Sequence, residues 1–189
     1  MNHPYWNYFL SIDSDLAQCE RFVEFSDANF HTYSIEFARI IMAASSEFDN
    51  VARALCKKIS PEKAPVNITQ YYPIIIGKYP KFLECEVLLP RYNISIKPWK
   101  KWTDTNAPDW WSKGYNKIKH ERDSYFDQAN LENAISSTAG LFVGILYYYD
   151  SCFGKSPNID VAQLPKLFDL QDYNPINSSS ISWTYDIPK

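Results

Sequence analysis

The sequence predicts a mainly α protein: a bundle of four long helices, with a small β-hairpin inserted between the second and third helices and an extended C-terminal strap. Apolar side chains recur at helical spacing over long stretches before residue 58 and after residue 108. Prolines interrupt residues 66–108, which also carry the short alternating patterns typical of strands. Residues 152–189 lose the helical period. We therefore expect one domain over 1–189, with an insertion at 66–108 and an extended tail at 152–189.

Composition excludes several classes of protein. The net charge is −3, so the chain is not a polybasic nucleic-acid binder, and any contact with nucleic acid should be local. The four cysteines are scattered without a C-x-x-C pair, which indicates reduced thiols and a cytoplasmic location. Three histidines argue against a His-rich metal centre, and we expect no metal site and no cofactor. The longest apolar run, 139–149, is too short to span a membrane, and no targeting signal precedes it.

Two helices are expected before the insertion. The first should run over about 4–25, with Pro4 in its first turn. The second should run over about 32–58, and Glu47 lies on its lateral face, beside the apolar seam. There a carboxylate could meet a cation from another helix. The apolar seam of the second helix consists of Phe37, Ile41, Ala44, Phe48, Val51 and Leu55.

The insertion is expected to form a small hairpin with loops. Residues 82–89 alternate in part and predict a strand, 90–93 predict a turn, and 94–97 predict the return strand. Lysines follow at Lys97, Lys100 and Lys101, interleaved with two tryptophans. Such a mixture either stacks on bases and contacts phosphates or pins a loop to the core through the tryptophans.

A third helix should begin near 108–109 and end near 127–128. On a regular helix, Trp111, Tyr115 and Ile118 form a stripe toward the core, while His120, Asn116 and Lys113 lie together on the opposite, polar face. A fourth helix over about 129–149 is apolar almost all round in its second half. It should be central in the bundle or buried between subunits, so we expect a homodimer formed through the third and fourth helices.

These helices and their motif resemble the HEPN superfamily, over about residues 5–58 and 108–150. The family signature is an arginine, then a polar residue that is often asparagine, then three residues and a histidine. Asn116 and His120 match the polar residue and the histidine, and the surrounding Trp110-Trp111 and Lys119-His120-Glu121-Arg122 strengthen the match. Tyr115 stands where the family has the arginine that binds the scissile phosphate.

The resemblance implies a metal-independent RNA endonuclease, a toxin or phage-defence component that cleaves by attack of the 2′-hydroxyl on the adjacent phosphorus. His120 would move a proton, Asn116 would position the phosphate or the imidazole, and Arg122 or Lys119 would offset the developing charge. Glu47 would orient His120 or hold Arg122. The residues expected to contact RNA are Lys113, Tyr115, Lys117 and Lys119. An antitoxin or regulatory partner protein is also implied.

Two alternatives remain open. Tyr115 at the arginine position favours a non-catalytic HEPN-like module that binds RNA, a nucleotide or a partner protein through the same cleft. On a regular helix Arg122 also points about 160° away from His120, which places it poorly for catalysis. The other alternative is a helical protein of unrelated role, in which Asn116 and His120 are simply solvated.

Overall fold

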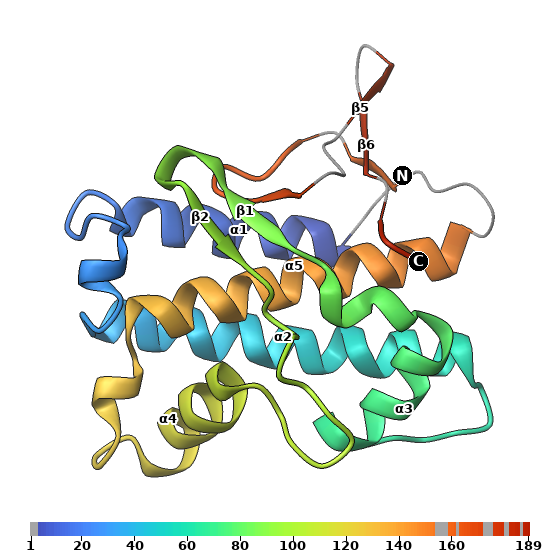
Figure 1. Ribbon diagram of the computed structural model, residues 1–189, viewed down its shortest axis with the longest axis horizontal. Coiled ribbons are helices and arrows are strands. Elements are labelled where there is room, and N and C mark those ends of the chain that lie inside the picture. Colours follow the sequence, from blue (N-terminus) through green and yellow to red (C-terminus); the bar gives the residue numbers. More distant parts are fainter. Residues whose placement is uncertain (1–3, 154–158, 162, 172–175, 180–181, 186) are drawn as a thin grey trace.

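Two long helices that run side by side in the same direction, α2 (Ile35–Ile59) and α5 (Leu131–Phe153), form the centre of the fold, and α1 (Pro4–Cys19) packs against both of them (Figure 1). The computed structural model describes residues 4–153, 159–161, 163–171, 176–179, 182–185 and 187–189. The predicted stripe of α2 is confirmed, because its six apolar residues are each at most 1% exposed. The order of the elements confirms the mainly helical fold class that the sequence predicts.

Local signals explain where these helices begin and end. The Ser34 hydroxyl caps α2 by accepting a hydrogen bond from the Phe37 amide at 3.0 Å. α1 ends at Cys19, before the predicted end near residue 25, because the chain turns there and returns toward α2. That turn leaves Phe22 86% exposed and buries Phe25.

The insertion contains a helix that the sequence analysis missed. α3 (Ile68–Lys78) includes the apolar run Ile74–Ile76 and begins at Asn67, whose side chain accepts from the Gln70 amide. Pro73 lies inside this helix and weakens its sequence signal, since proline is costly in helix interiors. A 3-10 helix, η2 (Pro80–Glu84), then occupies the start of the expected first strand.

The predicted hairpin is confirmed, in shorter form. β1 (Val87–Leu89) pairs antiparallel with β2 (Ile94–Ile96). The turn between them is the 3-10 helix η3 (Pro90–Tyr92), and Asn93 closes it with a left-handed φ of 52°. On its other edge β1 pairs with β4 (Asp169–Leu170) from the tail, which gives a sheet of order β2-β1-β4.

The tail is extended and strapped to the helices. β3 (Ile159–Val161), β5 (Ile176–Ser179) and β6 (Ser182–Tyr185) form a second antiparallel sheet of order β3-β6-β5. The buried Asp13 carboxylate of α1 accepts the backbone amides of Lys166 and Leu167 at 2.7 and 3.1 Å. The Tyr147 hydroxyl of α5 donates to the Pro188 carbonyl at 2.6 Å. These contacts fasten the strap to α1 and α5.

α5 is central, as its apolar surface predicts. Leu141, Phe142, Val143, Ile145 and Leu146 are all fully buried by other parts of the same chain. The homodimer prediction depended on this apolarity, which the fold of one chain already accounts for. None of the described helices combines the length and apolarity that crossing a membrane requires.

The third helix begins where predicted but ends at Glu121, before the predicted end near residues 127–128. In the predicted range lie one π-helical turn, η4 (Trp110–Tyr115), a short α4 (Asn116–Glu121) and, after a turn, the 3-10 helix η5 (Phe126–Gln128) (Figure 1). The chain leaves the helix at Arg122, because the Ser124 and Tyr125 amides both bond to the Glu121 carbonyl and close a turn.

Candidate functional site

The candidate site is carried by the continuous helical segment η4–α4. Its first turn is held by the Pro108 carbonyl, which accepts from the amides of Trp111 and Ser112 at 3.0 and 2.9 Å. The π-helical turn ends directly before Asn116. π-Helical turns are rare and occur often at functional sites, since they change the direction in which the following side chains point.

Buried tryptophans fix this segment to the core. The Trp110 indole N–H donates to the Pro98 carbonyl at 2.8 Å, and its ring packs on α5 at Gly140. A Cβ atom at Gly140 would lie 2.7 Å from the Trp110 ring, so glycine is required for this close approach. Gly114 packs in a similar way against the Asn133 side chain. The exposed face of η4–α4 is therefore held in a defined position.

Tyr115 belongs to the buried side of the segment. It is 7% exposed, and its ring centroid lies 5.0 Å from that of Trp111. The Lys119 ammonium lies 5.2 Å from the Tyr115 ring centroid and donates to its hydroxyl at 3.4 Å. Tyr115 thus positions Lys119, and its buried ring is not available for the direct RNA contact that the sequence analysis expected.

Three of the predicted residues meet in one open cleft, which we call the histidine cleft. Lys119, His120 and Arg122 form one wall, and the N-terminal half of α2 forms the other. The cleft has a volume of about 1050 Å³. Its full lining is Ile35, Ala38, Arg39, Met42, Ile118, Lys119, His120, Arg122, Asp123 and Phe126.

Arg122 and His120 line the same cleft although they lie on different sides of the helix end. α4 ends at Glu121, but the backbone of Arg122 keeps helical dihedral angles (φ −59°, ψ −33°), so the helical wheel still separates it from His120. The histidine cleft is open and extends past the helix end, so both side chains border it.

The charged side chains of the histidine cleft differ in whether they have a partner within the protein. Arg39 is held by Asp15, at 2.7 Å, and by Glu36. Within the described part of the chain, the side chains of His120 and Arg122 have no hydrogen-bonded or ion-paired partner, and both are exposed. Asp123 is the one carboxylate among the described lining residues. A cation and an imidazole are therefore available to an anionic ligand.

The remaining predicted residues lie outside this cleft. Asn116 is exposed, one turn before His120. Lys117 pairs with Glu121 at 2.7 Å, which raises the Lys117 pKa, and its ammonium lies 4.4 Å from the Tyr125 ring centroid. Lys113 pairs with Asp109 at 3.0 Å and lines a different cleft.

Glu47 does not meet His120 or Arg122. Its carboxylate accepts from the Asn50 amide at 3.3 Å and lies near Tyr5 at the start of α1. The pKa of Tyr5 is raised, first by burial and second by the charge of Glu47. Glu47 lies on another face of α2, and further along it, than the residues that line the histidine cleft, so within one chain the structure does not bring it to His120 or Arg122.

The sequence analysis missed the wall that α2 contributes. Ile35, Arg39 and Met42 line the cleft opposite His120. One sequence signal could have predicted an exposed apolar residue here, because Ile35 follows the Ser34 cap directly and lies off the buried stripe. In the structure Ile35 is 79% exposed. Which helix end faces α4, however, depends on the chain reversal between 122 and 130.

Neither a metal site nor a similar protein of known function gives further information on the histidine cleft. In the parts of the chain that the structure describes, no group of three or more His, Cys, Asp or Glu side chains is arranged to hold a metal ion. Comparison with protein-family models, curated proteins and solved structures gives no match for this chain. Function is therefore inferred from the chemistry of the residues themselves.

Proposed function

We propose that this protein is an RNA endonuclease whose active site is the histidine cleft. The observation that carries the proposal is that His120 and Arg122, both without a partner among the described residues, line one open cleft together with Lys119. Histidine is the side chain whose ordinary pKa lies near neutrality, and arginine is a permanent cation suited to phosphate. Cleavage of a phosphodiester can use both kinds of group, one to move a proton and one to stabilise the phosphoryl charge.

The proposed reaction is transesterification within the RNA. The 2′-oxygen forms a bond to the adjacent phosphorus while the bond from phosphorus to the 5′-oxygen breaks, which leaves a 2′,3′-cyclic phosphate and a 5′-hydroxyl. His120 moves one of the two protons, from the 2′-hydroxyl or to the leaving oxygen, and solvent in the open cleft exchanges the other. Arg122 and Lys119 stabilise the charge on the phosphoryl oxygens. No step of this chemistry requires a metal ion.

A second candidate is a non-catalytic module that binds RNA through the same cleft. Tyr115 favours it, because this residue occupies the position of the arginine in the HEPN signature and is buried. The two candidates differ in one respect: catalysis requires Arg122 to take over the phosphate, whereas binding alone does not.

The deciding experiment incubates purified protein with mixed RNA in the presence of EDTA, beside the His120→Ala and Lys58→Gln variants. Lys58 is an exposed residue at the far end of α2 and serves as the matched control. We expect cleavage with cyclic-phosphate ends by the wild type and Lys58→Gln, and none by His120→Ala. RNA that is bound but left intact by all three proteins would support the binding module instead.

If the protein is a toxin or a phage-defence component, as the resemblance implies, its expression should slow the growth of the host cell. His120→Ala should relieve that effect at equal protein level. If the wild-type protein cleaves RNA but its expression does not slow growth, the toxin role is contradicted and the proposed cleavage reaction is not.

A further inference from the structure

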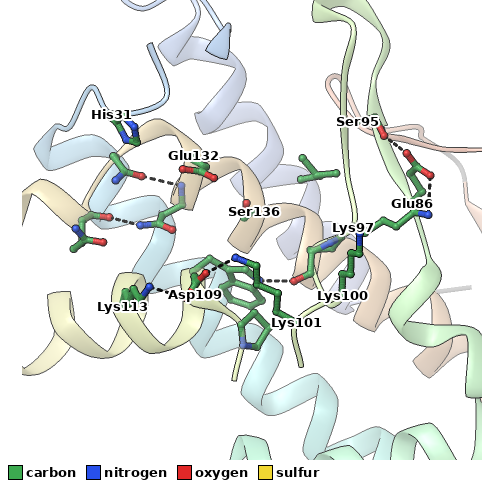
Figure 2. A pocket seen from close by; sticks show the side chains of 17 residues that line it. His31, Glu86, Ser95, Lys97, Lys100, Lys101, Asp109, Lys113, Glu132 and Ser136 are labelled. Atoms are coloured by element: carbon green, nitrogen blue, oxygen red, sulfur yellow. Dashed lines mark hydrogen bonds and ion pairs between the residues drawn. The ribbon is translucent and has the colours of Figure 1, made fainter. Parts of the chain in front are cut away.

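A second cleft lies on the other side of η4, and we call it the lysine cleft. It has a volume of about 710 Å³ and lies between the segment that follows β2 and the start of α5 (Figure 2). Its charged and titratable lining residues are Lys97, Lys100, Lys101, Lys113, Glu86, Asp109, Glu132 and His31. Four cations thus face three carboxylates and one histidine.

These cations are partly satisfied within the protein. Asp109 lies between Lys101, at 2.7 Å, and Lys113, at 3.0 Å, so one carboxylate serves two ammonium groups. Lys97 pairs with Glu86 at 3.3 Å. Lys100 has no ion pair or side-chain hydrogen bond to any residue that the structure describes. The wall formed by these four lysines therefore keeps an excess of positive charge.

The lysines are exposed but rigidly based. The side chains of Lys101 and Lys113 are 73% and 67% exposed. Lys100 and Lys101 lie between two tryptophans that are at most 1% exposed, Trp99 and Trp102. The Trp99 indole donates to the Gly140 carbonyl at 3.1 Å, and the Trp102 indole to the Ile68 carbonyl at 3.2 Å. The tryptophans anchor this part of the chain, and Lys100 and Lys101 between them face the solvent.

One helical segment connects the two clefts. Lys113 lines the lysine cleft and His120 lines the histidine cleft, and both are exposed, as is Asn116 between them. Seven residues at about 1.5 Å of helical rise span about 10 Å. At about 3.4 Å per nucleotide of a stacked strand, this distance corresponds to roughly three phosphates.

We propose that the lysine cleft binds the phosphates of an RNA strand that flank the phosphate in the histidine cleft. The substrate is then an RNA that extends at least about three nucleotides to one side of the scissile bond. Lys113, Lys101 and Lys100 receive these flanking phosphates in turn, whereas Glu132 repels them. This inference rests on the proposed function, because that function makes RNA the ligand. It concerns a separate cleft, however, whose contribution to RNA binding can be measured by itself.

The test measures binding without cleavage, in full-length protein that carries His120→Ala. Fluorescence anisotropy with a labelled single-stranded RNA is recorded from low to physiological salt. Adding Lys100→Gln and Lys101→Gln should weaken binding about fivefold to tenfold and flatten the logarithmic salt slope by about 1.4, since each contact with a single strand contributes about 0.7. Glu132→Gln should tighten binding about twofold, because it removes a like charge.

Controls and outcomes separate this inference from the proposed function. Lys58→Gln should bind like the parent, and a dinucleotide should bind equally to all variants because it is too short to reach the lysine cleft. Unchanged binding of the long RNA by the double lysine variant would overturn the inference, as would a parent protein that binds no RNA. If the lysine variants lose binding but the wild-type protein leaves RNA intact in the cleavage experiment, the lysine cleft stands and the nuclease proposal falls. If the wild-type protein cleaves RNA but the lysine substitutions leave RNA affinity unchanged, the nuclease proposal stands and the lysine cleft falls.

Discussion

The histidine cleft and the lysine cleft are both lined by cations, but their charges are held in different ways. In the histidine cleft, His120 and Arg122 are exposed at the end of a short helix, without a partner among the described residues. In the lysine cleft, Asp109 and Glu86 hold three of the four lysines, and buried tryptophans fix their backbone. Under the two proposals, the histidine cleft should act on charge that develops in the transition state, whereas the lysine cleft should bind charge that the substrate already carries.

The largest expected effect separates turnover from binding. His120→Ala should lower kcat for RNA cleavage by about 10²- to 10⁴-fold, the usual range for a general acid or base. Lys100→Gln should raise KM for a long RNA and leave kcat nearly unchanged, because it removes an interaction that is equal in the ground and transition states. Steady-state kinetics on one oligonucleotide measures both. A kcat effect of similar size in both variants would remove the distinction between the clefts.

The anchoring of the lysine cleft predicts a large effect on stability. Trp99→Ala should lower the free energy of unfolding by about 3–5 kcal/mol, since it empties a fully buried site that touches Phe48, Phe82 and Trp110. Phe22→Ala is the matched control, because that aromatic side chain is 86% exposed and should change stability by less than about 0.5 kcal/mol. Urea unfolding followed by circular dichroism gives both values. Equal effects would mean that Trp99 does not anchor the segment.

Arg122 tests whether the histidine cleft compensates for Tyr115. Arg122→Gln should reduce kcat about tenfold to a hundredfold, below the effect of a fully buried oxyanion donor because Arg122 is exposed. Arg122→Lys should recover part of the loss by restoring the charge without the bidentate geometry. If Arg122→Gln cleaves normally, another cation binds the scissile phosphate. Arg39→Gln would then be the next variant to measure, since Arg39 lines the opposite wall.

The smallest expected effect concerns Asp109, one of the three carboxylates of the lysine cleft. Lys101 and then Lys113 hold the pKa of Asp109 below its usual value. Its ion pairs therefore stabilise the fold above the usual Asp pKa, and this contribution is lost as the pH falls through the depressed value. NMR titration of the Asp109 carboxyl should show a midpoint below that of an exposed Asp, and Lys101→Gln should raise it. An unshifted midpoint in the wild type would mean that these lysines are free.

How much of the fold followed from the sequence depended on the length of each pattern. The stripe of α2 and the apolar α5 span many turns, so their periodicity determined both their type and their buried faces. The hairpin followed from its turn residues around Asn93. α3 was missed because Pro73 obscured a short helix, and the third helix was drawn too long because nothing in its sequence marks the π-helical turn or the reversal after Glu121.

For the site, the residue types were visible in the sequence and their grouping was not. Asn116, Lys119, His120 and Arg122 share one motif, but the helical wheel separated Arg122 from His120 and could not show that one open cleft against α2 borders both. Glu47 was predicted as a site residue because it lies beside the apolar seam of the second helix, yet in the structure it lies near Tyr5 at the start of α1.

The sequence by itself determined the helical class, the two central helices and the chemistry that the exposed face of α4 can offer. These properties depend on local spacing, which repeats along the chain. Only the tertiary structure decided which charges remain unpaired, that Tyr115 is buried, and that the lysines after β2 meet Lys113 across a cleft. These properties depend on contacts between residues far apart in the chain, where packing and solvent access are set by the whole fold.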